Sequence, residues 1–458
     1  MKRSLFHALI LTSLLSLSVT SVFAAKAQQP LTLEERGAVG YYQNGSETAA
    51  VKAAHNRLYF LYPASTEEKD PDLWNVYFLN PQRGSSYEIA EIGPTTKAVS
   101  SVTLKKGQGN VPQSLELNRR TYFGYVPESM PSLTDTALGN EPDEMPQDEE
   151  ALVGFYRSGG VLCAVREEKG ELQLVCPFLM QDRDMTQSNI YVMPKVHYDA
   201  YELKEKGPNT DSTSEVRFNR DRSGWGISLN IGNYSLSRIF TRGETGKPRR
   251  IKPASPLKQL RETAAKEEPP NLPYEKTADL VDITTVVPGV HLDLRYTTAN
   301  NLFGEPLVMS KKAYLDRTAA AALGRVQQKL QAYGYGLVIW EGYRSWTDFD
   351  AASKALGPAH AGMLPAPAEG YSHNSGRSVD VSLYDRESGE NISMISDFDE
   401  ISPAQYAAFP GGTQLNRWRR DLLRSLMTAE GFTASSDEWW HFDYDKAHSY
   451  KVLNDVMP

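Results

Sequence analysis

The stretches SHNSGRSVDVSL (372–383) and EWWHF (438–442) place two histidines and a carboxylate in a fixed order near the C-terminus. His373, Asp380 and His441 are residue types that bind a catalytic zinc ion and leave a fourth position for water. Neither stretch contains cysteine, which argues against a closed structural zinc site. The combination indicates metal-assisted hydrolysis.

Two more side chains suit this chemistry. Glu438 stands three residues before His441, where a carboxylate can take a proton from water and later give it to a leaving amine. Arg344 follows an apolar run at residues 337–340 that predicts a buried strand. A guanidinium at a strand end can stabilise the oxyanion of a tetrahedral intermediate. We therefore predict Glu438 as general base and Arg344 as a second catalytic residue.

The segment that joins the first two ligands also predicts its own local geometry. Gly376 allows a tight backbone turn after His373. Val379 and Val381 alternate around Asp380 as they would in a strand. We expect the carboxylate to lie on one face of that strand and the two valines to lie on the other.

Two amphipathic helices are expected in the same region, which makes it an α+β domain. We expect the first to be capped by Ser310 and ended by Gly334, and the second to run from about Gln414 to Gly431. Their buried faces are predicted to hold Ala319, Leu323, Val326 and Leu330 in the first helix and Leu415, Trp418, Leu422 and Leu426 in the second.

The C-terminal region resembles the D-alanyl-D-alanine dipeptidases, a subgroup of the zinc peptidases that also contains D-Ala-D-Ala carboxypeptidases. The resemblance covers about residues 270–458 and rests on the order of several short motifs. These are DLRYTTANNLFG (293–304), EGYRS (341–345), SHNSGRSVDVSL (372–383), SDFDEIS (396–402) and EWWHF (438–442).

The resemblance implies one zinc ion per chain. By motif, it places the metal on His373, Asp380 and His441, with Glu438 as base and Arg344 steadying the transition state. An M15-type zinc peptidase domain is the fold that it implies for this region.

The resemblance also implies a substrate site. Asp399 would hold the free ammonium group of a dipeptide with help from Tyr296, and Ser372 is a further substrate-binding candidate. The chain departs from the family pattern at Tyr371, where a serine is common. It departs again at NNLFG (300–304), where the family more often has an N-F-x-G pattern.

The N-terminus has the pattern of an export signal. Lys2 and Arg3 precede an interrupted apolar run at residues 5–19, and a small-residue cleavage site ends at Ala24. We expect a periplasmic or secreted protein, and an uncleaved membrane anchor is the alternative. No later stretch is expected to cross a membrane, and the net charge of −8 gives no reason to expect a nucleic-acid partner.

The two cysteines fit an exported chain. In VLCAVREEKGELQLVC, apolar and polar residues alternate on both sides of a turn at Lys169 and Gly170, as in a β-hairpin. This register would place Cys163 opposite Cys176, which makes them a candidate disulfide. Two buried free thiols are the alternative.

The region before the enzyme repeats itself. VGYY (39–42) recurs as VGFY (153–156), NVY (75–77) as NIY (189–191), and YEIAEIGP (87–94) as YELKEKGP (201–208). All three pairs share an offset of 114 residues, which indicates two copies of one unit. Short runs of Val, Tyr, Phe and Leu between Gly, Asn and Pro predict that each copy is mostly β.

The predicted fold is an α+β zinc peptidase domain at the C-terminus, preceded by two tandem mostly-β repeats. The expected division is a signal peptide at 1–24, β repeat 1 at 30–126, an acidic linker at 127–150, β repeat 2 at 151–242, a Pro-rich charged linker at 243–274 and a zinc D-Ala-D-Ala dipeptidase-like domain at 275–458.

The predicted function is an exported zinc-dependent dipeptidase that hydrolyses D-Ala-D-Ala or a related cell-wall dipeptide. One alternative is a D,D-carboxypeptidase or endopeptidase acting on peptidoglycan stem peptides. This alternative does not need a carboxylate for the substrate amine, so Asp399 favours the dipeptidase. A catalytically silent cell-wall-binding protein is the third hypothesis, and the intact ligand set argues against it. The β repeats could bind cell-wall glycan.

Overall fold

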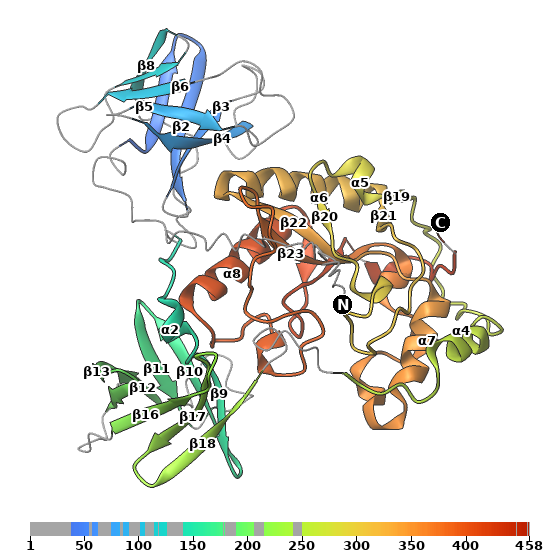
Figure 1. The fold of residues 1–458 in the computed structure, drawn as a ribbon. Helices are drawn as coiled ribbons and strands as arrows, with labels where there is room; N and C mark the ends of the chain where they lie inside the picture. The colour runs from blue at the N-terminus through green and yellow to red at the C-terminus, as the bar shows by residue number, and fades with distance from the viewer. Residues whose placement is uncertain are drawn as a thin grey trace, which may run out of the picture.

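The computed structural model describes residues 38–54, 57–62, 75–82, 86–90, 101–105, 114–117, 119–125, 141–176, 178, 189–205, 215–240, 250–445, 447–455 and 457. The expected export signal at 1–24 lies outside these residues. Two β regions precede an α+β region, and Figure 1 shows them in blue, in green and in yellow to red. Within the described part of the chain, no helix is long and apolar enough to cross a membrane.

The first β region, here called β unit 1, is a closed barrel of eight antiparallel strands. Each strand pairs with the next along the chain, and β8 closes the barrel by pairing with β1. Its core contains Tyr42, Val51, Phe60 and Val102. The strands are β1 (Gly40–Asn44), β2 (Glu47–Ala54), β3 (Arg57–Tyr62), β4 (Asn75–Pro81), β5 (Ser86–Ala90), β6 (Ser101–Lys105), β7 (Ser114–Leu117) and β8 (Arg120–Tyr125).

The second β region, β unit 2, is a ten-stranded barrel-like sheet with the order β13-β14-β16-β17-β18-β9-β10-β11-β12-β15. Short helix α2 (Gln147–Glu150) precedes it. Its strands are β9 (Gly154–Ser158), β10 (Val161–Glu168), β11 (Glu171–Val175), β12 (Ile190–Met193), β13 (Lys195–His197), β14 (Ala200–Glu202), β15 (Lys204–Glu205), β16 (Glu215–Arg220), β17 (Gly226–Ile231) and β18 (Tyr234–Ile239). Both β regions confirm the prediction of a mostly-β N-terminal part.

Matching features of the two β units are separated by 114 residues. Strands β1 and β9 begin 114 residues apart, at Gly40 and Gly154, and β2 and β10 also begin 114 residues apart. One side-chain hydrogen bond recurs at the same offset. The hydroxyl of Tyr42 donates to the carbonyl of Ala38, and the hydroxyl of Tyr156 donates to the carbonyl of Leu152.

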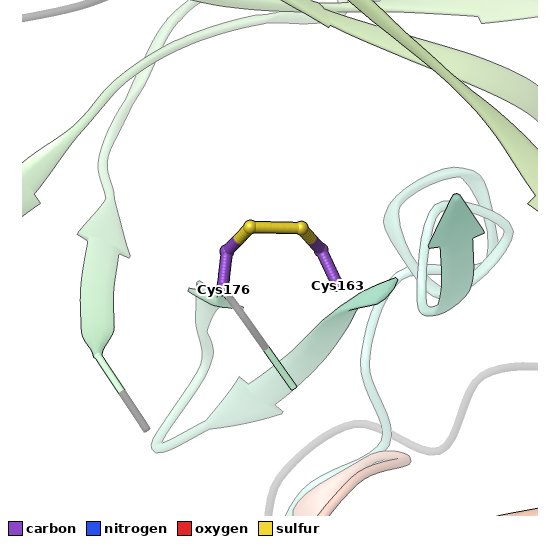
Figure 2. The surroundings of a disulfide bond; sticks show 2 residues. All are labelled: Cys163 and Cys176. Carbon is purple, nitrogen blue, oxygen red and sulfur yellow. A yellow bond between two sulfur atoms is a disulfide. The ribbon is translucent and has the colours of Figure 1, made fainter. Parts of the chain in front are cut away.

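A disulfide joins Cys163 in β10 to Cys176, the residue after β11, as Figure 2 shows. Cys163 and Cys176 have a Cα–Cα distance of 4.5 Å. Their pairing follows from the register, because Glu168 stands opposite Glu171 across a two-residue turn. Lys169 and Gly170 form that turn with φ values of 55° and 78°, as tight hairpin turns require.

The C-terminal region is built on a five-stranded sheet with the order β20-β22-β23-β25-β24. Helix α6 packs on β22, helix α8 packs on β24, and the two helices contact each other. The strands are β19 (Leu280–Asp282), β20 (His291–Leu292), β21 (Tyr314–Asp316), β22 (Tyr335–Glu341), β23 (Ser378–Asp385), β24 (Phe432–Ala434) and β25 (His441–Tyr444). The helices are α4 (Leu257–Ala264), α5 (Ile283–Val286), α6 (Arg317–Leu330), α7 (Trp346–Leu356) and α8 (Gln414–Ala429).

Both predicted helices form, and each buries the predicted apolar face. The predicted cap of the first helix is wrong. Asp316 caps α6 by accepting from the backbone N–H of Thr318, whereas Ser310 lies six residues earlier in a loop. Asp316 also accepts a hydrogen bond from Arg377, so the helix begins at a carboxylate that a tertiary contact holds, six residues after the predicted serine.

Part of the segment expected to link the second β region to the enzyme is helical. Helix α4 lies in this segment and packs on α7 (Figure 1), with Leu257 and Ala264 buried. Ile251, upstream of α4, is also buried in the core of the C-terminal region. Residues 250–264 therefore pack with the C-terminal region and do not extend away from it.

Each β unit docks on the C-terminal region through equivalent positions. Tyr41, Ala50 and Leu61 of β unit 1 join the main core of the C-terminal region. Residues 114 positions later, Phe155, Ala164 and Val175, pack with Ala404 and Phe409. Apolar residues at equivalent positions of the two units therefore contact two different parts of the C-terminal region.

Candidate active site

The three predicted ligands come together because their strands are neighbours in the sheet. Asp380 on β23 stands directly opposite His441 on β25. Val379 and Val381 are fully buried on the other face, as their alternation predicts. His373 reaches the same place from a short 3₁₀ helix, η6 (Ser372–Ser375).

Gly376 makes this approach possible. It ends η6 with φ = 73°, a left-handed conformation that is costly for other residues. A Cβ atom there would also lie 2.3 Å from the side chain of Leu280. The predicted turn residue is therefore required by both conformation and space.

The inner atoms of the three ligands lie within hydrogen-bonding distance of one another. His441 Nδ1 is 2.9 Å from Asp380 Oδ1 and 3.1 Å from His373 Nε2. His373 Nε2 is 3.3 Å from Asp380 Oδ1. Bonds of about 2.0–2.1 Å to a tetrahedral zinc ion would separate such ligand atoms by about 3.3 Å. The cluster therefore has the size of a zinc site.

The outer nitrogens of both imidazoles fix their protonation. His373 Nδ1 donates to the carbonyl oxygen of Gly342 at 2.7 Å. His441 Nε2 lies 3.1 Å from a carboxylate oxygen of Asp443, which can only accept. In the neutral imidazoles, both inner nitrogens therefore carry lone pairs beside a carboxylate, an arrangement that a shared cation stabilises. The residues present fit a zinc ion.

Asp443 is a functional candidate that the sequence interpretation missed. Its carboxylate also accepts a hydrogen bond from Ser378 Oγ, which holds it beside His441. A signal was available, since residues two apart on a strand share a face, and His441 and Asp443 are two apart. Ser372, a predicted substrate-binding residue, contacts the same nitrogen of His441. Its Oγ lies 3.3 Å from His441 Nε2.

Glu438 lies beside the ligands but outside their hydrogen-bonded cluster. Burial raises the pKa of its carboxyl group to about 7. The protonated form of His441 would lower this pKa, whereas the negative charges of Asp380 and Asp399 raise it further. A carboxyl group with a pKa near neutrality is suited to exchange protons with a reacting group.

Arg344 is buried and paired with Glu341, the first residue of the EGYRS motif. Two guanidinium nitrogens donate to the two carboxylate oxygens of Glu341. The guanidinium also lies over the ring of Tyr296, 4.4 Å from its centroid. The sequence interpretation missed Glu341, which stands across the sheet from Asp380. It fixes the direction of Arg344.

Asp399 and Tyr296 meet at the same site. The pKa of the Tyr296 phenol is raised well above its usual value by burial, and a hydrogen bond to Asp399 adds to the rise. Asp399 has φ = 56°, an uncommon conformation for a non-glycine residue that occurs more often at functional sites. Its charge also raises the pKa of Glu438, so the predicted ammonium contact lies near the predicted base.

The acidic stretch around Asp399 is not a solvated loop. Asp397 forms an ion pair with Arg295 at 3.0 Å, and Glu400 is buried. Arg295 also pairs with Asp293 at 2.8 Å. These contacts tie the Asp399 loop to the segment that carries Tyr296.

Tyr371 occupies the position where the sequence departs from the family pattern. Its ring stacks on Phe349 with a centroid distance of 5.0 Å. On the ligand side, it lies 5.0 Å from the ring of His373 and 6.3 Å from that of His441. An aromatic side chain thus lies beside the two candidate ligand histidines, at a position where serine is common in the family.

This sheet, with its His/Asp/His cluster, acidic neighbour and buried arginine, defines a peptidase domain. The sequence model of one family, described as D-Ala-D-Ala dipeptidase, matches residues 276–457. The chain belongs to this family, which confirms the resemblance.

Three relatives are D-alanyl-D-alanine dipeptidases. The Escherichia coli (strain K12) protein is 31% identical over 185 residues, or 39% of this chain and 91% of the relative. The Streptomyces coelicolor protein is 29% identical over 36% of this chain and 91% of the relative. The Enterococcus faecalis protein is 28% identical over 37% of this chain and 89% of the relative. The similarity thus spans most of each relative and the peptidase domain of this chain.

Proposed function

We propose that this protein is an exported zinc-dependent dipeptidase that hydrolyses D-Ala-D-Ala or a related cell-wall dipeptide. The observation that carries the proposal is the convergence of two imidazole lone pairs and a carboxylate within 3.3 Å, with Glu438 beside them. The names of the relatives supply the substrate class.

His373 Nε2, His441 Nδ1 and Asp380 Oδ1 would hold one zinc ion per chain. When bound, zinc supplies Lewis-acid polarisation of a water molecule and of the scissile carbonyl group. Asp443 and the carbonyl of Gly342 keep the two imidazoles in the required tautomers.

Glu438 acts as general base and then as general acid. It accepts a proton from the attacking water and delivers it to the amine that leaves. Burial raises the pKa of this carboxyl group, which favours its taking up and giving back a proton. Its position outside the ligand cluster leaves it free for this role.

Arg344 stabilises the negative oxygen that develops when water adds to the carbonyl group. Its guanidinium is held in place before the reaction by Glu341 and by the face of Tyr296. A donor that is oriented in advance needs no reorganisation when charge develops, which is the source of most electrostatic catalysis.

Asp399 binds the free ammonium group of the substrate. The phenolic hydroxyl of Tyr296 orients the Asp399 carboxylate through a hydrogen bond. A fixed carboxylate at this place restricts the site to substrates with a free amino terminus near the scissile bond. This contact distinguishes a dipeptidase from an enzyme that trims long stem peptides.

Export is proposed from the expected signal at residues 1–24 and is supported by the Cys163–Cys176 disulfide. Disulfides persist outside the cytoplasm and are rare within it. An exported enzyme of this class would act on dipeptides released from the cell wall.

We further propose that the two β units are copies of one ancestral unit. The common offset of 114 residues between strand starts, tyrosine hydrogen bonds and docking positions supports this. Binding of cell-wall glycan by these units stays a prediction.

Three substrates test the function: D-Ala-D-Ala, N-acetyl-D-Ala-D-Ala and a stem pentapeptide ending in D-Ala-D-Ala. Release of D-Ala by the purified, zinc-loaded protein should be fastest from the free dipeptide. Loss of one partner of a buried charge pair costs about 2–5 kcal/mol, so acetylation should slow hydrolysis strongly. Equal rates for the free and acetylated dipeptides would remove Asp399 from its role, and preference for the pentapeptide would favour a carboxypeptidase.

A further inference from the structure

Glu167 of β unit 2 is a buried carboxylate that binds the peptidase domain. It lies in the β10–β11 hairpin and is only 4% exposed. Its Oε2 accepts a hydrogen bond of 2.6 Å from the backbone N–H of Gln414, the first residue of α8. Its Oε1 accepts from the backbone N–H of Gly170 at 2.6 Å. A first-turn N–H has no partner within its own helix, and the helix dipole favours a carboxylate there.

The same hairpin holds the loop that precedes α8. The backbone N–H of Glu167 donates to the carbonyl of Gly412 at 3.1 Å, and Arg166 donates to the carbonyl of Pro410 at 3.2 Å. In return, Arg417 of α8 donates to the carbonyl of Glu167 at 2.8 Å. Several directional contacts therefore fix this loop to β unit 2.

An aromatic cluster supports the polar contacts. The ring of Phe409 lies 5.5 Å from that of Phe155 and 6.0 Å from that of Phe178, both in β unit 2. These edge-on and tilted arrangements are favourable for aromatic pairs. Residues 409–414 are thus held by β unit 2 along their length.

Residues just before this held segment contact the neighbours of Glu438. The carbonyl of Gln405 accepts from the backbone N–H of Trp439 at 2.8 Å. The backbone N–H of Ala407 donates to the carbonyl of Ser436 at 3.2 Å. The general base therefore lies between two residues that are hydrogen-bonded to the segment before α8.

Asn416, two residues after the held segment, contacts the loop that carries Asp399. Asn416 donates to the carbonyl of Ser393 at 3.2 Å. The indole N–H of Trp439 donates to Ser396 Oγ at 2.8 Å, which connects the Asp399 loop with the Glu438 segment. A short chain of hydrogen bonds therefore connects the β10–β11 hairpin with the segments that carry Asp399 and Glu438.

We propose that Glu167 is a positioning residue for Asp399 and Glu438, acting through residues 403–416. The proposal rests on the proposed function for its catalytic consequence. The equivalent position of β unit 1 is Ala53, 114 residues earlier, so β unit 1 offers no carboxylate there. Misplacing reacting groups by about 1 Å can reduce a rate by about 100-fold.

The test compares Glu167→Ala and Glu167→Gln with a control, Glu171→Gln, at an exposed position of the same hairpin. We expect Glu167→Ala to lower kcat/KM for D-Ala-D-Ala about 10-fold to 100-fold while full zinc content is retained. The ratio of rates for free and N-acetylated dipeptide should also fall, because Asp399 is displaced. Glu167→Gln should show a smaller effect, since its amide oxygen can still accept one of the two hydrogen bonds.

A purely structural role for Glu167 predicts a different pattern. Partial unfolding would lower the rates for both dipeptides in proportion and leave their ratio unchanged. An unchanged ratio and kcat/KM in folded Glu167→Ala protein would overturn the proposal. If this variant does not fold, Glu167→Gln decides by the same criteria.

Amide hydrogen exchange separates this inference from the proposed function. The N–H of Trp439 should exchange faster in both Glu167 variants than in the wild type and Glu171→Gln, while β22 stays protected. Unchanged exchange at Trp439 would reject the positioning role even if the enzyme is active. Wild-type protein that hydrolyses neither dipeptide would reject the function, and the exchange experiment would still decide the positioning.

Discussion

The two β units have similar strands but contact the peptidase domain in different ways. β unit 1 approaches the end of α6, where Lys52 lies 3.9 Å from the ring centroid of Tyr333 and Tyr59 faces Gly334. β unit 2 approaches the start of α8 and binds it through Glu167 and Arg166. The second contact continues by hydrogen bonds into the segments that carry Glu438 and Asp399.

The two units differ in the polar residues at equivalent positions. At the positions of Cys163 and Glu167 in β unit 2, β unit 1 has Ala49 and Ala53. The apolar docking positions are retained in both units, whereas the disulfide and the buried carboxylate occur in β unit 2. Apolar docking attaches each unit to the enzyme, and the polar residues of β unit 2 connect it to the active site.

The largest expected effect is in the peptidase domain itself. His373→Ala should remove most of the bound zinc and abolish hydrolysis, because a three-ligand site has little redundancy. Elemental analysis of purified protein measures the metal content. Full zinc in this variant would reject His373 as a ligand. Variants in either β unit should keep full zinc, which separates metal binding from positioning.

A smaller effect is expected at Asp443, which contacts a ligand from outside. Asp443→Asn keeps the size of the side chain but weakens its hydrogen bond to His441 Nε2. Loss of such a partner commonly lowers metal affinity about 10-fold to 100-fold. Competition with a zinc chelator measures this change, with Asp445→Asn, a largely exposed carboxylate, as control. Equal affinities for the two variants would show that Asp443 does not support the ligand.

The smallest effect is expected where β unit 1 docks. Lys52→Ala removes a cation–π contact with Tyr333 that should contribute about 0.5–2 kcal/mol to stability. Denaturant unfolding should report this loss, while kcat/KM should stay within about twofold of the wild type. A decrease in kcat/KM as large as that of Glu167→Ala would mean that β unit 1 also supports the active site.

Much of the active site could be predicted because its signals are local. The strand alternation around Asp380 and the turn at Gly376 are set within a few residues, and both form as predicted. Asp443 was accessible to the same reasoning and was missed. Glu341 could not be assigned from spacing alone, because its role depends on the pairing of β22 with β23.

Other features depend on contacts between distant residues. The cap of α6 is Asp316 because Arg377, far along the chain, holds its carboxylate in place. Barrel closure in β unit 1 requires β8 to pair with β1, which no local pattern indicates. The contact of Glu167 with Gln414 joins residues 247 positions apart, so only the folded chain shows it.

The central claim is that Glu438 is a general base beside a zinc site and is not itself a ligand. Glu438→Gln keeps the size of the side chain and removes its basic oxygen. Proton transfer commonly contributes about 10²–10⁴-fold to a rate, so turnover of D-Ala-D-Ala should fall by at least about 100-fold. Zinc content and the fold should be unchanged, because the three ligands remain.

Zinc content and turnover, measured together on one preparation of the Glu438→Gln protein, test this claim most directly. The account predicts one zinc ion per chain and a loss of turnover of at least about 100-fold. Full zinc with near-normal turnover would contradict the role of Glu438 as base. Loss of zinc together with turnover would make Glu438 a ligand and contradict the site described for His373, Asp380 and His441.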